Sequence, residues 1–433
     1  MIALNQSAPQ HLNPYLAMLV RAREKQRQWA SESIRNRLQI VRRVRESVAS
    51  HAKSLLEAFP RELRLAPAER LASELIPFAE ACRFLEREAN KILASRRLLN
   101  KHLPIWLRHI EVEEHREPLG VILIIGAENY PFFLPGVQVL QALVAGNAAV
   151  VKPGRKGGPV MHRLQCVFKD AGLPPDLFVV LDEDIQAVEH TICQGVDKVI
   201  FTGSTETGIQ VYRLAADHLT PVILELSGED PVFVLKSADL ERAADAIAFG
   251  LSWNAGKTCI APKRVFVAES IAKMFNVVLQ IKCPEAISSL PILTFRDEEE
   301  AIILASQSPY ALGASVFGDP REACDLADRI RAGVVVINDL IVPTSDPRVA
   351  FGGRDQSGFG KTRGAEGLKE MTILKFVIVQ RAKRLRHLER LPENATDLFL
   401  AYLSASHASS WRERMNAGFK LLSTALASRR SVR

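Results

Sequence analysis

The chain has few cysteines, and their positions exclude two classes of protein. Only six occur in 433 residues, scattered without a single Cys-x-x-Cys pair. A disulfide framework or a zinc site needs paired cysteines at short spacing, so we expect neither, and no metal. Histidine is equally scattered, and none lies between His218 and His387. No histidine therefore lies close enough in sequence to Cys259 to suggest a base for it.

Long apolar runs are also missing. No run approaches the ~20 residues that are needed to span a bilayer. Residues 1–14 lack the apolar core of a secretory signal. The composition, 47% hydrophobic and 24% charged, is that of an ordinary globular protein. We therefore expect a cytoplasmic protein with a large core, divided into two or three domains.

Excess charge is absent from most of the chain. Residues 381–433 hold eleven Lys/Arg and four Asp/Glu, which equals the whole net charge of +7. In this tail, apolar residues at steps of 4, 4, 3 and 4 predict one face of a helix with basic flanks. They are Trp411, Met415, Phe419, Leu422 and Leu426. Such a helix either packs on the body or makes weak membrane-surface contact. Nucleic-acid binding is not expected, since no base-stacking aromatics interleave the charges.

What is present is a regular alternation of helices and short apolar strands. Residues 15–100 show helical spacing of apolar residues and predict a helical layer over a sheet. Four buried strands are then expected, with helices between them. They cover 120–125, 148–151, 177–181 and 198–201. This order is typical of an open parallel α/β sheet.

In such sheets, ligands bind where strands end and loops enter helices. Three loops lie there: 126–131, 152–158 and 202–208. In the last, Gly203, Ser204 and Gly208 would let backbone amides and a helix N-terminus approach a phosphate. The loop is neither Gly-x-Gly-x-x-Gly nor a P-loop, so by itself it identifies no ligand.

Two side chains could carry chemistry. Cys259 lies in a small-residue turn, 254–262, between a helix-like run and the strand-like run 264–267. It is either a packed core residue or a thiol aimed at a substrate. Glu225 lies inside an apolar strand, where a carboxylate is either paired structurally or kept near neutral pKa for proton transfer. The segment alone leaves both readings of Glu225 open.

Nine motifs in this order resemble the NAD(P)-dependent aldehyde dehydrogenase superfamily over roughly residues 20–380. They are Glu117–Gly120, Asn129–Pro131, Ala145–Asn147, Val151–Pro153, Phe201–Ser204, Glu225–Gly228, Asn254–Cys259, Tyr310–Phe317 and Phe351–Gly353 with Ser357–Gly360. The resemblance implies an α/β fold with a Rossmann-type parallel-sheet cofactor domain and a reduced α/β catalytic domain. The implied divisions are 1–225, 226–371, an oligomerisation strand 372–380 and a basic helical tail 381–433.

The resemblance also implies catalytic roles in the oxidation of an aldehyde to an acid. Cys259 would attack the aldehyde carbonyl as a thiolate. The amide of Asn129 and the backbone N–H of Cys259 would hold the oxyanion. Glu225 would act as general base for the water that releases the acid.

The cofactor would be NAD or NADP. Lys152 would bind its ribose, and Gly203 and Ser204 would lie by its pyrophosphate. Arg155 stands where an acid or small polar residue is usual in the family, and could pair with a 2′-phosphate. Glu285 could replace the family's Glu-x-Phe-Gly-Pro glutamate on the nicotinamide ribose, displaced by one position.

The short segment between Cys259 and Leu290 keeps two further readings open. One is a reductase of an acyl thioester on the same fold, although the base Glu225 is unwanted for that reaction. The other is a non-catalytic scaffold or binding protein. A homodimer is expected because the strands at 105–114 and 372–379 would be exposed edges in a monomer.

Overall fold

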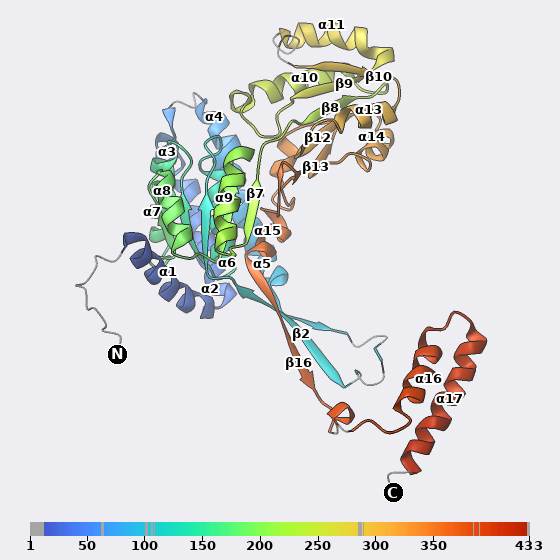
Figure 1. Ribbon diagram of the computed structural model, residues 1–433. Helices are drawn as coiled ribbons and strands as arrows, with labels where there is room; N and C mark the ends of the chain where they lie inside the picture. The colour runs from blue at the N-terminus through green and yellow to red at the C-terminus, as the bar shows by residue number, and fades with distance from the viewer. Residues whose placement is uncertain are drawn as a thin grey trace, which may run out of the picture. The chain divides into compact units, whose positions relative to one another are not determined.

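The computed structural model describes residues 13–430 apart from 62–64, 100–102, 105, 106, 108, 285–287, 289, 384 and 389 (Figure 1). The chain separates into two compact units. One is Met1–Arg96 with Glu114–Phe376, and the other is Arg97–Glu113 with Val377–Arg433. The predicted divisions at 225, 371 and 380 stay predictions. Glu285, one of the predicted cofactor residues, lies outside the described residues.

The first unit begins with the predicted helical layer. Its elements are α1 (Pro14–Ser31), α2 (Ile34–Ser50), α3 (Ala52–Glu57), α4 (Pro67–Arg70), a π-helical turn (Leu71–Leu75) and α5 (Ile76–Ile92). The helical spacing of apolar residues predicted over 15–100 is confirmed on α2, where Val41, Val44 and Val48 are buried. Polar side chains cap several of these helices, as Ser33 does at the start of α2.

The first sheet has six strands in the order β15-β7-β6-β3-β4-β5. The strands are β3 (Val121–Ile125), β4 (Ala148–Lys152), β5 (Phe178–Val180), β6 (Lys198–Thr202), β7 (Val222–Glu225) and β15 (Gly358–Phe359). All five residues of β3 are buried, as expected for a parallel strand covered on both faces. Only β15 runs antiparallel to its neighbour.

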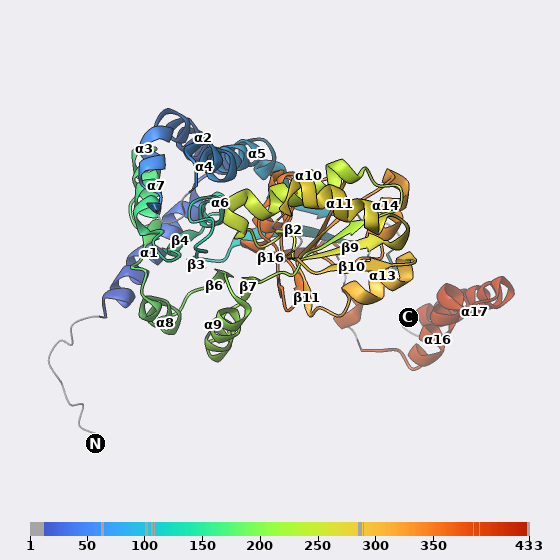
Figure 2. The same cartoon turned by 90° about the horizontal axis from the view of Figure 1, so that it is seen from above.

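Four helices cover the two faces of this sheet. They are α6 (Phe133–Val144), α7 (Gly158–Asp170), α8 (Ile185–Cys193) and α9 (Thr205–Asp217). Figure 2 shows α6 and α7 on one face and α8 and α9 on the other. Consecutive strands β3 and β4 lie side by side, whereas β6 lies on the opposite side of β3. The loops after β3 and β6 therefore diverge and leave a crevice at the carboxyl edge of the sheet.

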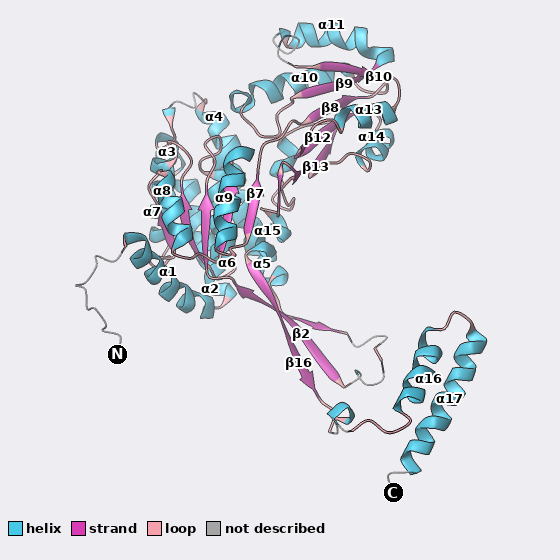
Figure 3. Ribbon diagram, viewed as in Figure 1, coloured by secondary structure: helices cyan, strands magenta, loops and turns pink. Residues whose placement is uncertain are grey.

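The second sheet is entirely parallel, in the order β10-β9-β8-β12-β13. Its strands are β8 (Pro231–Val234), β9 (Arg264–Ala268), β10 (Ile292–Phe295), β12 (Gly313–Phe317) and β13 (Val334–Ile337). Its helices are α10 (Leu240–Ser252), α11 (Ala272–Lys282), α13 (Glu298–Ala305) and α14 (Pro320–Ala327). Val232 packs with α10 and α11, whereas Phe233 packs with α13 and α14. Adjacent residues thus point to opposite faces, and both faces are covered, so the predicted α/β class is confirmed (Figure 3).

The segment after the second sheet returns to the first. It begins with a 3₁₀ turn (Val342–Ser345). β14 (Arg354–Asp355) then pairs with β11 (Tyr310–Ala311). After β14, β15 pairs with β7. The next helix is α15 (Gly364–Glu370). Its residue Leu368 belongs to the core of the first sheet. This return brings residues far apart in sequence next to the end of β7.

The remaining strands form a three-stranded sheet, β1-β2-β16. They are β1 (Arg96–Leu98), β2 (Ile110–Pro118) and β16 (Thr372–Gln380). The expectation that two strands would both be open edges is wrong for β2, because it lies between the others. It holds for β16, whose residues 373–380 are exposed.

The tail forms two helices, α16 (Ala395–His407) and α17 (Trp411–Arg430). The predicted stripe on α17 includes Trp411, Met415, Phe419 and Leu422, each more than half exposed. Nothing is described of the side chain of Leu426. None of the described helices is both long and apolar enough to cross a membrane.

Candidate active site

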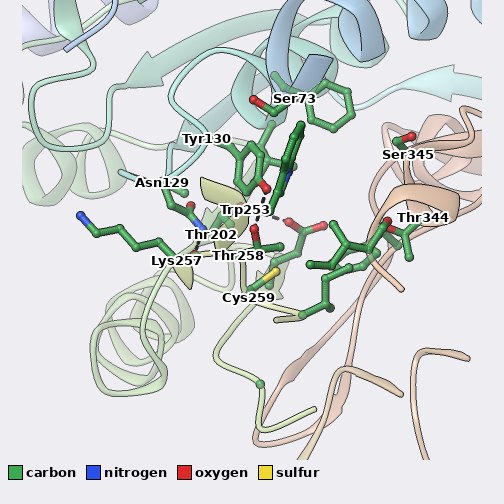
Figure 4. A pocket seen from close by; sticks show the side chains of 18 of the residues that line it. Ser73, Asn129, Tyr130, Thr202, Trp253, Lys257, Thr258, Cys259, Thr344 and Ser345 are labelled. Carbon is green, nitrogen blue, oxygen red and sulfur yellow. Dashed lines mark hydrogen bonds between the residues drawn. The ribbon is translucent and has the colours of Figure 1, made fainter. Parts of the chain in front are cut away.

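A cavity of about 570 Å³ opens at the carboxyl edge of the first sheet. It is bounded by the loops after β3 and β6, the end of β7, the turn that carries Cys259, and residues 341–345 (Figure 4). Most of its wall is apolar. The apolar lining includes Ala72, Pro77, Phe133, Leu134, Trp253, Ile260, Ile341, Val342 and Phe351. A cavity of this size with a few polar groups is typical of a small-molecule site.

The turn that carries Cys259 is held in a strained backbone conformation. Asn254 and Ala255 have φ of 52° and 51°, in the left-handed region. For alanine this region costs about 1–2 kcal/mol. The backbone N–H of Asn254 donates to Glu69 Oε1 at 2.6 Å, and its Nδ2 donates to the backbone oxygen of Asn129 at 2.9 Å. These contacts fix the turn, so the position of Cys259 is set before any ligand binds.

Asn129 and Cys259 line the same cavity. The Asn129 Nδ2 donates to the backbone oxygen of Lys257 at 2.7 Å. This bond uses one of the two hydrogens of the amide and fixes its plane. Beside it, the Tyr130 hydroxyl and Thr258 Oγ1 are hydrogen-bonded at 2.7 Å (Figure 4). Asn129 and Tyr130 thus hold in place Lys257 and Thr258, the two residues that directly precede Cys259.

The Cys259 thiol is protonated in this arrangement. Although the residue keeps part of its surface exposed, desolvation of the thiol raises its pKa to about 12. The carboxylates of Asp230 and Glu225 add to this rise, while Arg363 and the backbone N–H of Ile260 oppose it. Since only a thiolate attacks a carbonyl efficiently, the thiol needs a proton acceptor and a nearby positive charge.

Glu225 ends β7 and lies opposite Thr202 of β6. The carboxyl group is buried and accepts hydrogen bonds from Thr202 Oγ1 at 3.3 Å and from Thr362 Oγ1. Burial raises the pKa of Glu225, against the opposing effects of Thr362 and Arg363. A carboxyl group with a raised pKa in a cavity can accept and return a proton near neutral pH.

Arg363 lines the cavity but carried no sequence signal. It is 7% exposed, and its guanidinium carbon lies 4.4 Å from the centre of the Phe351 ring. Its Nη1 donates to the backbone oxygen of Thr344 at 2.9 Å. Burial lowers its pKa, whereas Glu225 and Cys259 raise it. An arginine remains charged in proteins, so this end of the cavity contains a buried cation.

The glycine loop after β6 reaches the cavity in part. Gly203 and Ser204 line it, and Ser204 caps α9 by accepting from the backbone N–H of Thr207 at 3.3 Å. Gly208 lies in α9 outside the lining. A Cβ added there would stand 2.4 Å from Leu226 Cδ2. Gly208 is therefore required for helix packing, and only the first part of the loop offers an anion site.

Lys152 and Arg155 lie outside the cavity lining. Lys152 is the half-buried last residue of β4, and its burial lowers its pKa. Arg155 is exposed and pairs with both carboxylate oxygens of Glu128, at 3.1 and 3.2 Å. Glu183 accepts from the backbone N–H groups of Lys156 and Gly158, at 2.6 and 2.8 Å. The amides at the start of α7 are thus already occupied by a carboxylate.

Five further residues complete the site and were not predicted from sequence. They are Tyr130, Thr202, Thr258, Thr362 and Arg363. The first three adjoin predicted residues or loops and could have been found by adjacency. Thr362 and Arg363 follow a glycine-rich loop, and only the pairing of β15 with β7 brings that loop to Glu225. No cluster of acids, histidines or cysteines that could hold a metal occurs among the described residues.

Comparison with known proteins identifies a single family. The family model described as "Aldehyde dehydrogenase family" matches residues 14–283 and 289–377. A curated relative, the 4,4'-diapolycopene aldehyde oxidase of Methylomonas sp, is 28% identical over 408 residues. The match covers 78% of this chain and 77% of that protein.

Solved structures show the same fold. The substrate-bound state of AldH from Staphylococcus aureus has a TM-score of 0.81 at 22% identity, over 90% of this chain and all of that one. Aldehyde dehydrogenase of Mycobacterium tuberculosis, complexed with NAD+, has a TM-score of 0.77 at 22% identity, over 86% of this chain and 90% of that one. At this identity the likeness concerns the fold alone.

Proposed function

The chain belongs to the aldehyde dehydrogenase family of NAD(P)-dependent oxidoreductases, and we propose that it oxidises an aldehyde to a carboxylic acid through a thioester on Cys259. The observation that carries the proposal is the meeting of Cys259, Glu225 and Asn129 in one cavity. These three groups come from the turn before β9, the end of β7 and the loop after β3. They supply a nucleophile, a proton acceptor and a hydrogen-bond donor.

The first step is attack of the Cys259 sulfur on the aldehyde carbon. The thiol proton passes to the ionised carboxylate of Glu225, a C–S bond forms, and the carbonyl oxygen becomes an oxyanion. The second N–H of the Asn129 amide and the backbone N–H of Cys259 stabilise that oxyanion. The bond from Asn129 to Lys257 O keeps the amide oriented, so no reorganisation is needed as charge develops.

The second step releases the acid. A bound nicotinamide would supply the acceptor for the hydride whose loss converts the adduct to a thioester. Glu225 releases the thiol proton to solvent and then takes a proton from water, and the hydroxide formed attacks the thioester carbon. The C–S bond breaks, and the proton on Glu225 returns to the sulfur of Cys259. Thr202 and Thr362 hold the carboxyl group in place for this transfer.

The cofactor fits the start of α9. Gly203 and Ser204 line the cavity there, where a helix N-terminus favours the pyrophosphate. Lys152, at the end of β4 beside Ile125 of β3, would bind a ribose hydroxyl. We expect NAD to be preferred over NADP. Arg155 is already paired with Glu128. A 2′-phosphate near α7 would be repelled by the carboxylate of Glu183, which already accepts hydrogen bonds from the backbone amides there.

The apolar wall predicts an apolar aldehyde as substrate. No carboxylate other than those of Glu128 and Glu225 is among the residues that line the cavity. The Methylomonas relative is named as an oxidase of an aldehyde, 4,4'-diapolycopene aldehyde. Long-chain and aromatic aldehydes should therefore have higher kcat/KM than charged or short ones.

The test is to follow absorbance of the reduced nicotinamide with a panel of aldehydes and either cofactor. Production of acid and reduced cofactor by wild type, and none by Cys259→Ala, supports the proposal. If the two proteins match on every substrate, the proposal fails. Consumption of the reduced cofactor that depends on an acyl thioester would instead support the reductase. Failure to bind either cofactor would support the scaffold.

We also propose that β16 pairs with a second copy of the chain. Residues 373–380 are exposed, and six of them are large and apolar: Ile373, Leu374, Phe376, Val377, Ile378 and Val379. An apolar edge strand of this kind favours pairing with another strand. Light scattering should show a dimer for wild type and a monomer for Ile378→Asp.

The tail provides a candidate membrane-surface contact. Trp411, Met415, Phe419 and Leu422 are exposed on α17, which also carries Arg412, Arg414 and Lys420. A helix with an apolar face and basic flanks binds weakly to anionic lipid surfaces. Co-sedimentation should detect binding to vesicles that contain phosphatidylserine and less binding for Phe419→Ser. Equal recovery with and without vesicles would contradict this proposal.

A further inference from the structure

Arg363 is a buried cation without a contact ion pair in the part of the chain that is described. Its contacts are two rings, Phe351 and Phe133, two carbonyl-type oxygens and no carboxylate. The guanidinium stacks on Phe351, Nη1 donates to Thr344 O, and the backbone N–H donates to Gln141 Oε1 at 3.2 Å. The Nε is buried and has no hydrogen-bond partner. A buried charge is costly unless something nearby compensates for it.

Three acidic groups line the same cavity as Arg363 and interact electrostatically with it. They are the Glu225 carboxyl group, the Cys259 thiol and the Tyr130 phenol. Tyr130 stays neutral, because burial raises its pKa to about 12. The compensating charge therefore resides on Glu225, on Cys259, or on both in exchange.

Other charged groups around the cavity do not duplicate this role. Lys257 and Lys263 line the cavity, but neither is among the main influences on the pKa of Glu225 or Cys259. Lys361 lowers the pKa of Glu225, and its Nζ donates to the backbone oxygen of Gly352. Asp230, behind the turn, adds negative charge and so opposes a thiolate. Among the described residues, Arg363 is the cation that both reactive groups share.

Building on the proposed function, we propose that Arg363 is the counter-charge of the Cys259–Glu225 pair and allows that pair to carry one negative charge at neutral pH. The proton of the Cys259 thiol moves to the ionised Glu225. The S–H bond breaks and an O–H bond forms, so the charge shifts from oxygen to sulfur. The total charge of the pair is unchanged, and Arg363 offsets it in both states.

Removing the cation would change the protonation of the pair. Without Arg363, ionised Glu225 and ionised Cys259 both lose the positive charge that they share in a poorly solvated site. The pair then binds one more proton at neutral pH, and the thiol has no acceptor. Arg363 is thus a positioning residue: it acts on the reaction through the protonation of Cys259 and Glu225.

Alkylation of Cys259 by iodoacetamide tests this role without substrate or cofactor. Cys166, Cys193 and Cys324 are exposed and will also react, so modification must be quantified on the peptide that contains Cys259. For Arg363→Met we expect the rate at neutral pH to fall at least about tenfold, because one unit of pKa changes the thiolate fraction about tenfold. For Arg363→Lys, which keeps the charge, the rate should stay within about threefold of wild type.

The matched control is Arg70→Met. Arg70 also lies over a phenylalanine ring, Phe59, at 5.6 Å, donates to the backbone oxygen of Pro60, and has a buried Nε without a partner. It does not line the cavity. Its loss should leave alkylation of Cys259 unchanged. An equal fall in both methionine variants would mean that loss of any packed arginine disturbs the site, and would overturn the proposal.

Two further outcomes would overturn it. One is a folded Arg363→Met protein, judged by thermal unfolding, that alkylates at the wild-type rate. The other is a tenfold fall in Arg363→Lys, which is decisive even if the methionine variant does not fold. Aldehyde oxidation is measured separately. A thiol that responds to Arg363 in a protein without that activity would refute the proposed function alone.

Discussion

Charged groups at the two ends of the candidate site behave in opposite ways. At the exposed end, Arg155 and Glu128 form a two-bond ion pair whose side chains are 74% and 45% exposed. At the buried end, Arg363 and Glu225 are 7% and 4% exposed and form no contact pair. An exposed pair contributes only about 0–1 kcal/mol, because water screens it. Buried charges are screened far less, so they shift each other's pKa across a gap. The Arg155–Glu128 pair is therefore expected to affect activity less than Arg363 and Glu225 do, although its charges are in closer contact.

Replacement of Cys259 by alanine is the largest expected effect at the buried end. It removes the nucleophile, so kcat for aldehyde oxidation should fall by at least about 10³-fold. The thermal unfolding midpoint should hardly change, since the turn is held by Asn254 and Thr258 rather than by the sulfur. Stopped-flow absorbance of the reduced cofactor should also lose any burst. Residual turnover within tenfold of wild type would exclude Cys259 as the nucleophile.

Glu225→Gln should have the next largest effect. Loss of a general base lowers kcat by about 10²–10⁴-fold. In wild type, burial raises the pKa of Glu225, and the carboxyl group must be ionised to accept a proton. Activity should therefore rise as pH increases through that raised pKa, and the acidic limb should vanish in Glu225→Gln. An unchanged pH profile in the variant would assign the limb to another group.

The buried carboxyl group of Glu74 should make the stability of the fold depend on pH. Its carboxyl group accepts from the backbone N–H groups of Phe132 and Phe133, and burial raises its pKa to about 8. The folded state thus binds a proton that the unfolded state releases above pH of about 4.5. Between these values the free energy of unfolding should fall by about 1.4 kcal/mol per pH unit from this group.

Chemical denaturation at about pH 5.5 and about pH 7.5 measures this slope. Glu74→Gln cannot titrate, so its free energy of unfolding should depend less on pH than that of wild type. Asp230, whose pKa burial raises to about 7, contributes a slope of the same sign and remains in the variant. Identical slopes in the two proteins would show that Glu74 is ionised in the folded state.

The exposed end should give the smallest effects. Arg155→Ala should change kcat/KM for NAD by less than about fivefold, since an exposed pair contributes at most about 1 kcal/mol. Glu128→Gln frees the guanidinium, and should raise the ratio of NADP to NAD activity by about fivefold at most for the same reason. Paired measurements at low and high salt provide the check, because salt weakens exposed charges. A hundredfold switch would mean that Arg155 directly contacts the cofactor.

Local sequence patterns identified much of the fold. The apolar runs from 120 to 201 became β3, β4, β5 and β6, because an apolar segment of this length must be buried and a parallel strand buries both faces. The strand predicted at 105–114 was displaced, since β2 covers Ile110–Pro118. Alternation marks a half-buried strand but does not fix where pairing starts or stops. Local patterns also could not predict the order of the strands in a sheet, and so could not predict that β2 lies between two neighbours.

The sequence by itself determined the class of fold and predicted a thiol and a carboxylate that line one cavity, because these predictions depend on residue type and on neighbours along the chain. Only the tertiary structure decided the charge that surrounds them. Glu225 and Arg363 are 138 positions apart, and the antiparallel pairing of β15 with β7 brings their segments together. Burial and electrostatic interaction depend on distance in space, which no local pattern encodes. The same reason separates Gly208, which packs against Leu226, from Gly203, which reaches the cavity.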